Sequence, residues 1–192
     1  MSTITVVQKE SSVAIAADSL TTWGSAKDSA AHVVNHSKII RVGDSYLGIS
    51  GPTSAKLALN DYFASRSDVD LTTVESIFRT WLSLHSSLKS HYFLNPHEDD
   101  SDSFESTRVD VLIANPSGIF GVAAHRAVQQ FAKFYSYGTG WQHALGAMYA
   151  VYSDENLTAE EIATKGVTAA AEFDSATGLP VVSFTLRRNL GT

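Results

Sequence analysis

The chain has 192 residues, of which 44% are hydrophobic and 18% are charged. These proportions are typical of a globular protein with a sizeable core and exclude a disordered or fibrous chain. The formal net charge of −6 argues against a nucleic-acid-binding protein, because contacts to phosphates need clustered Lys and Arg. We expect a single domain over residues 1–192.

The absence of cysteine removes disulfides, Cys-ligated zinc and Cys nucleophiles from consideration. No apolar run approaches the roughly 20 residues that a membrane span needs, and the first residues lack the basic and then apolar pattern of a signal peptide. The simplest prediction is a soluble cytoplasmic protein that does not associate with membranes.

The first fifty residues predict four antiparallel strands. Two short runs rich in β-branched residues and Ala, Thr3–Val7 and Ser12–Ala17, are separated by polar residues and predict a hairpin. A second hairpin is predicted from Lys38–Val42 and Ser45–Ser50, which a Gly-Asp turn connects.

The periodicity then becomes that of helices. Thr53–Ala64 is compatible with a helix that Thr53 would cap. Apolar residues at three- and four-residue spacing from Val74 to Leu88 predict a second, amphipathic helix. Thr72 and Glu75 form a capping-box pattern at its start.

An acidic stretch, Asn95–Thr107, interrupts the pattern. We interpret it as a solvated loop, and the functional alternative is a lining that favours basic substrates. Strands return at Val109–Ala114 and Ile119–Val122, which an Asn-Pro-Ser-Gly turn joins. A further strand is predicted at Ala132–Tyr137.

The C-terminal third predicts two helices and a strand. The helices are Trp141–Tyr152 and Thr158–Phe173, and the second begins with Thr158 and Glu161 in a capping-box pattern. The strand is Val181–Arg187. Runs of strands separated by pairs of helices predict two sheets with helices outside them, which is an α+β layered domain.

Ser2 is a candidate nucleophile. A Met before a small residue is normally removed during synthesis, which would leave Ser2 with a free α-amine whose reference pKa is about 8. A hydroxyl beside an amine that acts as general base is an activated nucleophile. The alternative is that Ser2 is the frayed start of the chain.

Three further residues are predicted to lie near Ser2 and to assist it as a nucleophile. Asp18 ends the second predicted strand and Lys38 begins the third, so the two side chains would pair near Ser2; the alternative is a surface salt bridge of little energetic value. Gly51 lies between a strand and a helix, where a backbone N–H can donate to an oxyanion. The alternative for Gly51 is an ordinary glycine at a helix entry.

Taken together, these features resemble the proteasome β-subunit family, most closely its bacterial branch of HslV-like peptidases and bacterial proteasome homologues. Six motifs match in order over nearly the whole chain: Ser2-Thr3-Ile4-Thr5-Val6-Val7, Ala17-Asp18-Ser19, Lys38-Ile39, Ser50-Gly51-Pro52, Gly138-Thr139-Gly140 and Asp174-Ser175-Ala176-Thr177-Gly178. Each motif alone is common, but six in register are specific. The resemblance implies the N-terminal-nucleophile (Ntn) hydrolase fold, a four-layer α-β-β-α sandwich of two antiparallel sheets.

The resemblance also implies roles for the matched residues. Ser2 would be the nucleophile, the pair of Lys38 and Asp18 would lower the barrier to deprotonating it, and the Gly51 N–H would stabilise the oxyanion. Thr139, Asp174 and Thr177 would hold the α-amine in place by hydrogen bonds.

Substrate contacts follow from the same resemblance. Thr22 would pair with the substrate backbone as an added strand. The pocket for the side chain before the scissile bond would be lined by Thr21, His36, Ile49 and Thr53.

The chain departs from the family at three positions, which are Ser2 in place of a Thr, Pro52 in place of a Gly and Thr139 in place of a Ser, a conservative change. Ser replaces the family's Thr at the nucleophile and lacks the methyl group that restricts χ1, so we expect slower turnover. Thr3 is a rival nucleophile if both Met1 and Ser2 are removed, and retention of Met1 would block the amine. Pro52 replaces a second Gly and removes one N–H, which leaves Gly51 as the donor.

The resemblance implies a self-compartmentalising peptidase that forms homo-oligomeric stacked rings and cleaves peptides or unfolded proteins through an acyl-enzyme. The alternatives are a catalytically silent ring scaffold or binding protein and an Ntn amidase acting on small amides. No GxxxxGK[ST] motif is present, so any energy input has to come from another chain, such as an AAA+ unfoldase. We predict no cofactor and no catalytic metal, and the structural cation found in related peptidases is not predicted.

Overall fold

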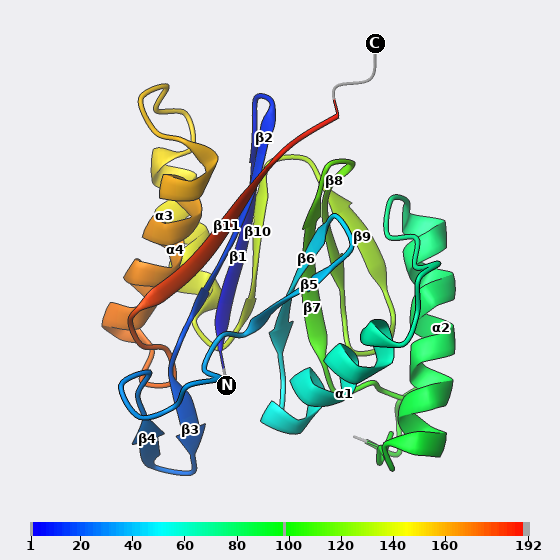
Figure 1. Cartoon of the computed structure of the whole chain (residues 1–192). Helices are drawn as coiled ribbons and strands as arrows, with labels where there is room; N and C mark the ends of the chain where they lie inside the picture. Colours follow the sequence, from blue (N-terminus) through cyan, green and yellow to red (C-terminus); the bar gives the residue numbers. More distant parts are fainter. Residues whose placement is uncertain (1, 98, 190–192) are drawn as a thin grey trace.

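The computed structural model describes residues 2–97 and 99–189, and its sheets and helices form four layers (Figure 1). Two antiparallel sheets lie in the middle, with one pair of helices outside each. The first sheet has the order β10-β1-β2-β11, with β1 Thr3–Lys9, β2 Ser12–Asp18, β10 Phe134–Gly138 and β11 Val181–Arg187. The second has the order β5-β6-β7-β8-β9, with β5 Ile39–Val42, β6 Ser45–Ser50, β7 Asp110–Asn115, β8 Gly118–Val122 and β9 Val128–Phe131.

Helices cover the outer face of each sheet (Figure 1). The helices are α1 Thr53–Ala64 and α2 Val74–His91 outside the second sheet, and α3 Trp141–Val151 and α4 Ala159–Phe173 outside the first. A small hairpin of β3 (Thr21–Trp23) and β4 (Ala26–Asp28) projects beside the N-terminal end of β1. No helix within the described part of the chain has the length and apolar character needed to cross a bilayer.

Three apolar clusters hold the layers together, and strand β1 shows how the sequence sorts its side chains among them. Ile4 and Val6 are fully buried in the cluster between the two sheets. Val7, on the opposite face of the strand, belongs to the cluster beneath α3 and α4. Successive side chains of a strand alternate in direction, so a strand buried on both faces has an almost continuously apolar sequence. The predicted four-layer α+β sandwich is therefore confirmed.

Two predicted helix caps are wrong by one residue. Pro52, not Thr53, is the N-cap of α1, and its carbonyl accepts from the Ala55 N–H at 2.9 Å. Thr73, not Thr72, caps α2. The Thr72 hydroxyl instead donates to Asp70 at 2.6 Å, so it takes part in a side-chain turn before the helix begins.

The strand predicted at Ala132–Tyr137 is also wrong in its boundaries. β9 ends at Phe131 in one sheet, and β10 begins at Phe134 in the other. The chain crosses between the sheets within two residues, and neither Gly nor Pro marks this point. The β3–β4 hairpin was not predicted; its turn contains Gly24 at φ +60°. The capping box of Thr158 and Glu161 is confirmed.

Candidate active site

Ser2 lies directly before β1, and its position is fixed by contacts with other parts of the chain. It is 3% exposed. Its carbonyl oxygen accepts a hydrogen bond from the backbone N–H of Thr139 at 2.8 Å. Thr3 pairs with Gly138 in the β1–β10 ladder. The loop after β10 therefore fixes the backbone of Ser2. The prediction that Met1 is removed concerns a residue that lies outside the described ranges, 2–97 and 99–189.

Asp18, at the end of β2, is fully buried and receives four hydrogen bonds. One carboxylate oxygen accepts from the Lys38 ammonium at 2.7 Å and from the Thr3 N–H at 2.9 Å. The other accepts from the N–H groups of Leu20 and Gly178, each at 3.1 Å. A buried charge needs such partners. Asp18 therefore joins the first strand, Lys38 and the loop before β11 at one point.

Lys38 lies directly before β5 and is 9% exposed. Burial lowers the pKa of its ammonium, because a low-dielectric environment disfavours the charged form, while the adjacent Asp18 carboxylate opposes that effect. The predicted pair of Asp18 and Lys38 therefore exists, and it is a buried ion pair and not a surface salt bridge.

Thr139, Asp174 and Thr177, which the sequence predicts around the α-amine, form one hydrogen-bonded cluster beside Ser2. One oxygen of Asp174 accepts from the Thr139 hydroxyl at 2.5 Å and from the Thr177 hydroxyl at 2.6 Å. Burial raises the pKa of Asp174, but these hydrogen bonds outweigh it and hold the pKa below its ordinary value. The Asp174 carboxylate therefore orients two hydroxyl groups next to the start of β1.

Thr3 belongs to the same cluster, and sequence reasoning did not assign it there. Its hydroxyl oxygen accepts from the Gly140 N–H at 3.1 Å and lies 2.6 Å from the hydroxyl oxygen of Thr177. Because the proton of Thr177 is committed to Asp174, the proton between the two hydroxyls comes from Thr3. Thr3 is fully buried. A polar residue on the helix-facing side of a buried strand was the signal that a partner had to exist.

Lys56, on α1, is a second residue that sequence reasoning missed. Its ammonium donates to the carbonyl oxygens of Asn35 at 2.5 Å and Ser37 at 2.8 Å. Burial and, to a smaller extent, the charge of Lys38 lower its pKa. Lys56 therefore anchors the segment that carries His36 and Lys38. A lysine in the first turn of a helix carries no sequence signal for this contact.

A cavity of about 460 Å³ opens beside Ser2. Its lining brings together three predicted catalytic residues and all five predicted substrate-binding residues, namely Ser2, Lys38 and Gly51, and Thr21, Thr22, His36, Ile49 and Thr53. Thr21 and Thr22 come from β3, and Ile49 is a buried residue of β6. The cavity therefore offers space for an amino-acid side chain directly beside Ser2.

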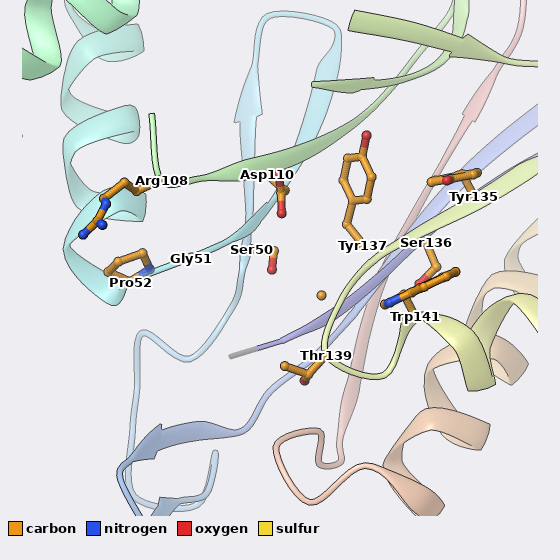
Figure 2. Close-up of a pocket in the computed structure, with 11 residues that line it drawn as sticks. Ser50, Gly51, Pro52, Arg108, Asp110, Tyr135, Ser136, Tyr137, Thr139 and Trp141 are labelled. Carbon is orange, nitrogen blue, oxygen red and sulfur yellow. The ribbon is translucent and has the colours of Figure 1, made fainter. Parts of the chain in front are cut away.

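A second cavity, of about 700 Å³, lies on the other side of Gly51 and Pro52, between β7 and β10 (Figure 2). Gly51 and Pro52 line both cavities. Thr139, whose N–H binds the Ser2 carbonyl, belongs to the lining of the second. A chain bound across Ser2 would thus have one cavity on each side.

Residues 2–97 and 99–189 contain no group of three or more His, Asp or Glu arranged to hold a metal ion.

Comparison with known proteins identifies the family. Neither a scan against protein-family models nor a search of curated proteins gives a match. Among solved structures, that of Thiobacillus denitrificans BPH is 55% identical, with a TM-score of 0.94, and the match covers 98% of this chain and all of that one. The same protein in complex with epoxomicin matches at 55% identity and TM-score 0.91, over 96% of this chain and 98% of that chain.

A eukaryotic HslV from Trypanosoma brucei shares the fold at 18% identity and TM-score 0.68, over 97% of this chain and 99% of that chain. Identity above one half over essentially both full chains is far closer than shared fold alone requires. The chain therefore belongs to the family of bacterial proteasome homologues, the HslV-like branch of the proteasome β-type peptidases.

Proposed function

We propose that this chain is a peptidase whose nucleophile is the hydroxyl of Ser2, exposed once Met1 is removed. The observation that carries the proposal is the placement of Ser2, Lys38 and Gly51 around one cavity, with Asp18 buried behind Lys38. The epoxomicin complex of the Thiobacillus denitrificans protein supports it, because epoxomicin is a peptide epoxyketone, a reagent for N-terminal nucleophiles.

In the first step, the Ser2 oxygen attacks the carbonyl carbon of the scissile peptide bond. The hydroxyl proton passes to the α-amine of Ser2, directly or through water, and the carbonyl oxygen becomes an oxyanion. The ammonium of Lys38 lowers the cost of forming negative charge on the Ser2 oxygen. The Gly51 N–H donates to the oxyanion.

The tetrahedral intermediate then collapses. The C–N bond breaks, and the departing amine takes the proton that the α-ammonium returns. The product is an ester between the substrate carbonyl and Ser2, which water hydrolyses with the same α-amine as base. Thr139, Asp174 and Thr177 hold the amine in place through both halves of the reaction.

The same proposal includes the assembly and the partners. The chain forms one proteasome-β-like domain that assembles into homo-oligomeric stacked rings enclosing the active sites. Peptides and unfolded chains are the substrates, with Thr22 pairing to the substrate backbone. A separate AAA+ unfoldase would unfold folded proteins and deliver them to the ring, because this sequence has no GxxxxGK[ST] motif with which to use ATP itself.

The test is the intact mass of the purified protein, measured with and without epoxomicin. We expect loss of Met1 and one adduct per chain, because the reagent forms a ring with a free α-amine and the hydroxyl next to it. Ser2→Ala is the matched variant: it retains a small residue after Met1, so processing is preserved, but it has no hydroxyl and gains no adduct. A mass that retains Met1 and shows no adduct contradicts the proposal and favours a silent ring component.

A further inference from the structure

The cavity between β7 and β10 has a chemical character of its own. Aromatic rings of Tyr135, Tyr137 and Trp141 form one side of it, and Asp110 faces them from the first position of β7 (Figure 2). Trp141 is 42% exposed, so its ring is available from the cavity. The cavity therefore combines one carboxylate with several aromatic faces.

The wall that carries Asp110 is rigid. Asp110 pairs with Ser50 across the β6–β7 ladder, directly before Gly51. One of its carboxylate oxygens accepts from the Ala124 N–H at 2.9 Å. The residue is half-buried. The strand pairing and this hydrogen bond fix the carboxylate at a set distance from the turn that carries the oxyanion donor.

Asp110 supplies the negative charge among the residues that line the cavity, and it faces the aromatic rings. Burial, with a contribution from the charge of Asp110, raises the pKa of Tyr137 to about 12, so its hydroxyl stays neutral. Arg108 also lines the cavity, but its guanidinium donates to the His97 carbonyl at 2.8 Å and is directed away from Asp110 (Figure 2). A carboxylate beside aromatic faces is an environment that attracts a cation.

The position of the cavity decides which part of a substrate would enter it. The cavity beside Thr21 and Ile49 is assigned to the residue before the scissile bond, and a chain lying across Ser2 continues past Gly51 and Thr139 on the other side. We propose that the cavity between β7 and β10 receives the substrate residue that follows the scissile bond, and that Asp110 gives this subsite a preference for Lys or Arg. The inference rests on the proposed function.

The test uses internally quenched peptides that differ only in the residue after the scissile bond, which is Lys, Leu or Glu. Their common sequence is taken from a cleavage that the protein makes in an unfolded protein, mapped by mass spectrometry. We expect kcat/KM for the Lys peptide to exceed that for the Glu peptide about tenfold, from a half-buried ion pair with aromatic contacts. In Asp110→Asn, which keeps an oxygen to accept from Ala124, the ratio falls to about twofold or less.

Two controls separate the possible failures. Asp44→Asn removes the same charge from the exposed β5–β6 turn, at the far end of the strands from Gly51, and is expected to keep the wild-type preference. A peptide coumarin amide of the same sequence carries none of the three test residues after the scissile bond, so its hydrolysis by the wild-type protein measures the proposed peptidase activity without the charge contrast. Equal Lys to Glu ratios in wild type and Asp110→Asn overturn the inference alone. Failure to hydrolyse both the amide and the peptides overturns the proposed function and the inference with it.

Discussion

The hydroxyl oxygens of Thr3 and Thr177 lie 2.6 Å apart, although the two residues are 174 positions apart in the chain. The contact belongs to a directed series of hydrogen bonds from the Gly140 N–H through Thr3 and Thr177 to Asp174. Each hydroxyl in the series accepts one proton and donates its own. Thr3 is therefore fully engaged within the protein, one residue away from the proposed nucleophile.

Thr3→Val is expected to lower the free energy of unfolding by about 1–3 kcal/mol, because it leaves the buried Gly140 N–H without its acceptor. Thr3→Ser keeps the hydroxyl, so its free energy of unfolding should fall by less. Chemical denaturation measures the free energy of unfolding of both variants. Both variants should still form the epoxomicin adduct at Ser2. An adduct that disappears in Thr3→Val but persists in Ser2→Ala would instead make Thr3 the nucleophile.

Ser2→Thr is expected to raise kcat by about two- to threefold. The added methyl group restricts χ1, so less conformational entropy is lost when the hydroxyl is held for attack. The cavity beside Ser2 offers room for one methyl group. Steady-state hydrolysis of a coumarin amide measures the change, with adduct stoichiometry as the count of active sites. A kcat per active site equal to or below that of the wild type contradicts this account of the substitution.

Asp18→Asn tests the buried ion pair through the pH dependence of the reaction. Burial lowers the pKa of Lys38, and the Asp18 carboxylate raises it. Without the carboxylate, the pKa of Lys38 should therefore fall further. We expect kcat/KM to fall by about 10²–10⁴-fold and its alkaline limb to move to lower pH, because Lys38 loses its proton earlier as the pH rises. A pH profile that falls uniformly, with its alkaline limb unmoved, would leave Asp18 with a structural role only.

Glu105 links the acidic segment to α2 and is expected to contribute to acid resistance. Hydrogen bonds from Lys89 and His85 lower its pKa from the ordinary value of 4.5 to about 2. A folded-state pKa below the unfolded value stabilises the protein above about pH 4.5, and this stabilisation is lost as the pH falls towards 2. In Glu105→Gln, the stability difference from wild type should be constant from pH 7 to 5 and shrink below pH 4.5.

Acid unfolding followed by tryptophan fluorescence measures this difference for Glu105→Gln. Glu155→Gln, in the exposed turn after α3, removes the same charge at a site without these partners and serves as the matched control. A difference in stability that stays constant down to pH 2 would show that folding does not lower the pKa of Glu105.

The elements with strong local signals were predictable from sequence. The boundaries of β11 were predicted as found, Val181–Arg187, because a β-branched run there lies between turn residues. The capping box at Thr158 depends only on residues three positions apart. The crossing between Phe131 and Phe134 was not predictable, because it depends on which sheet each strand joins, and the aromatic residues on both sides suit either sheet.

Some contacts of the candidate active site were likewise predictable from the sequence, and others were not. The meeting of Asp18 with Lys38 followed from their positions at strand ends and from the family resemblance, and the structure brings them together. The engagement of Thr3 by Thr177 and the anchoring of the Lys38 segment by Lys56 are contacts between distant parts of the chain. Neither has a local pattern, so only the folded arrangement reveals them.

The contacts of Asp18 and Asp174 determine when the candidate active site can form. Asp18 needs the Gly178 N–H, and the cluster around the start of β1 needs Asp174 and Thr177. A chain still being made on the ribosome exposes Ser2 long before residues 174–178 exist. On the proposed mechanism such a nascent chain has no anchored base and cannot cleave its neighbours. On that mechanism, proteolytic activity would arise only once residues 174–178 have packed against the start of β1 in the folded protein.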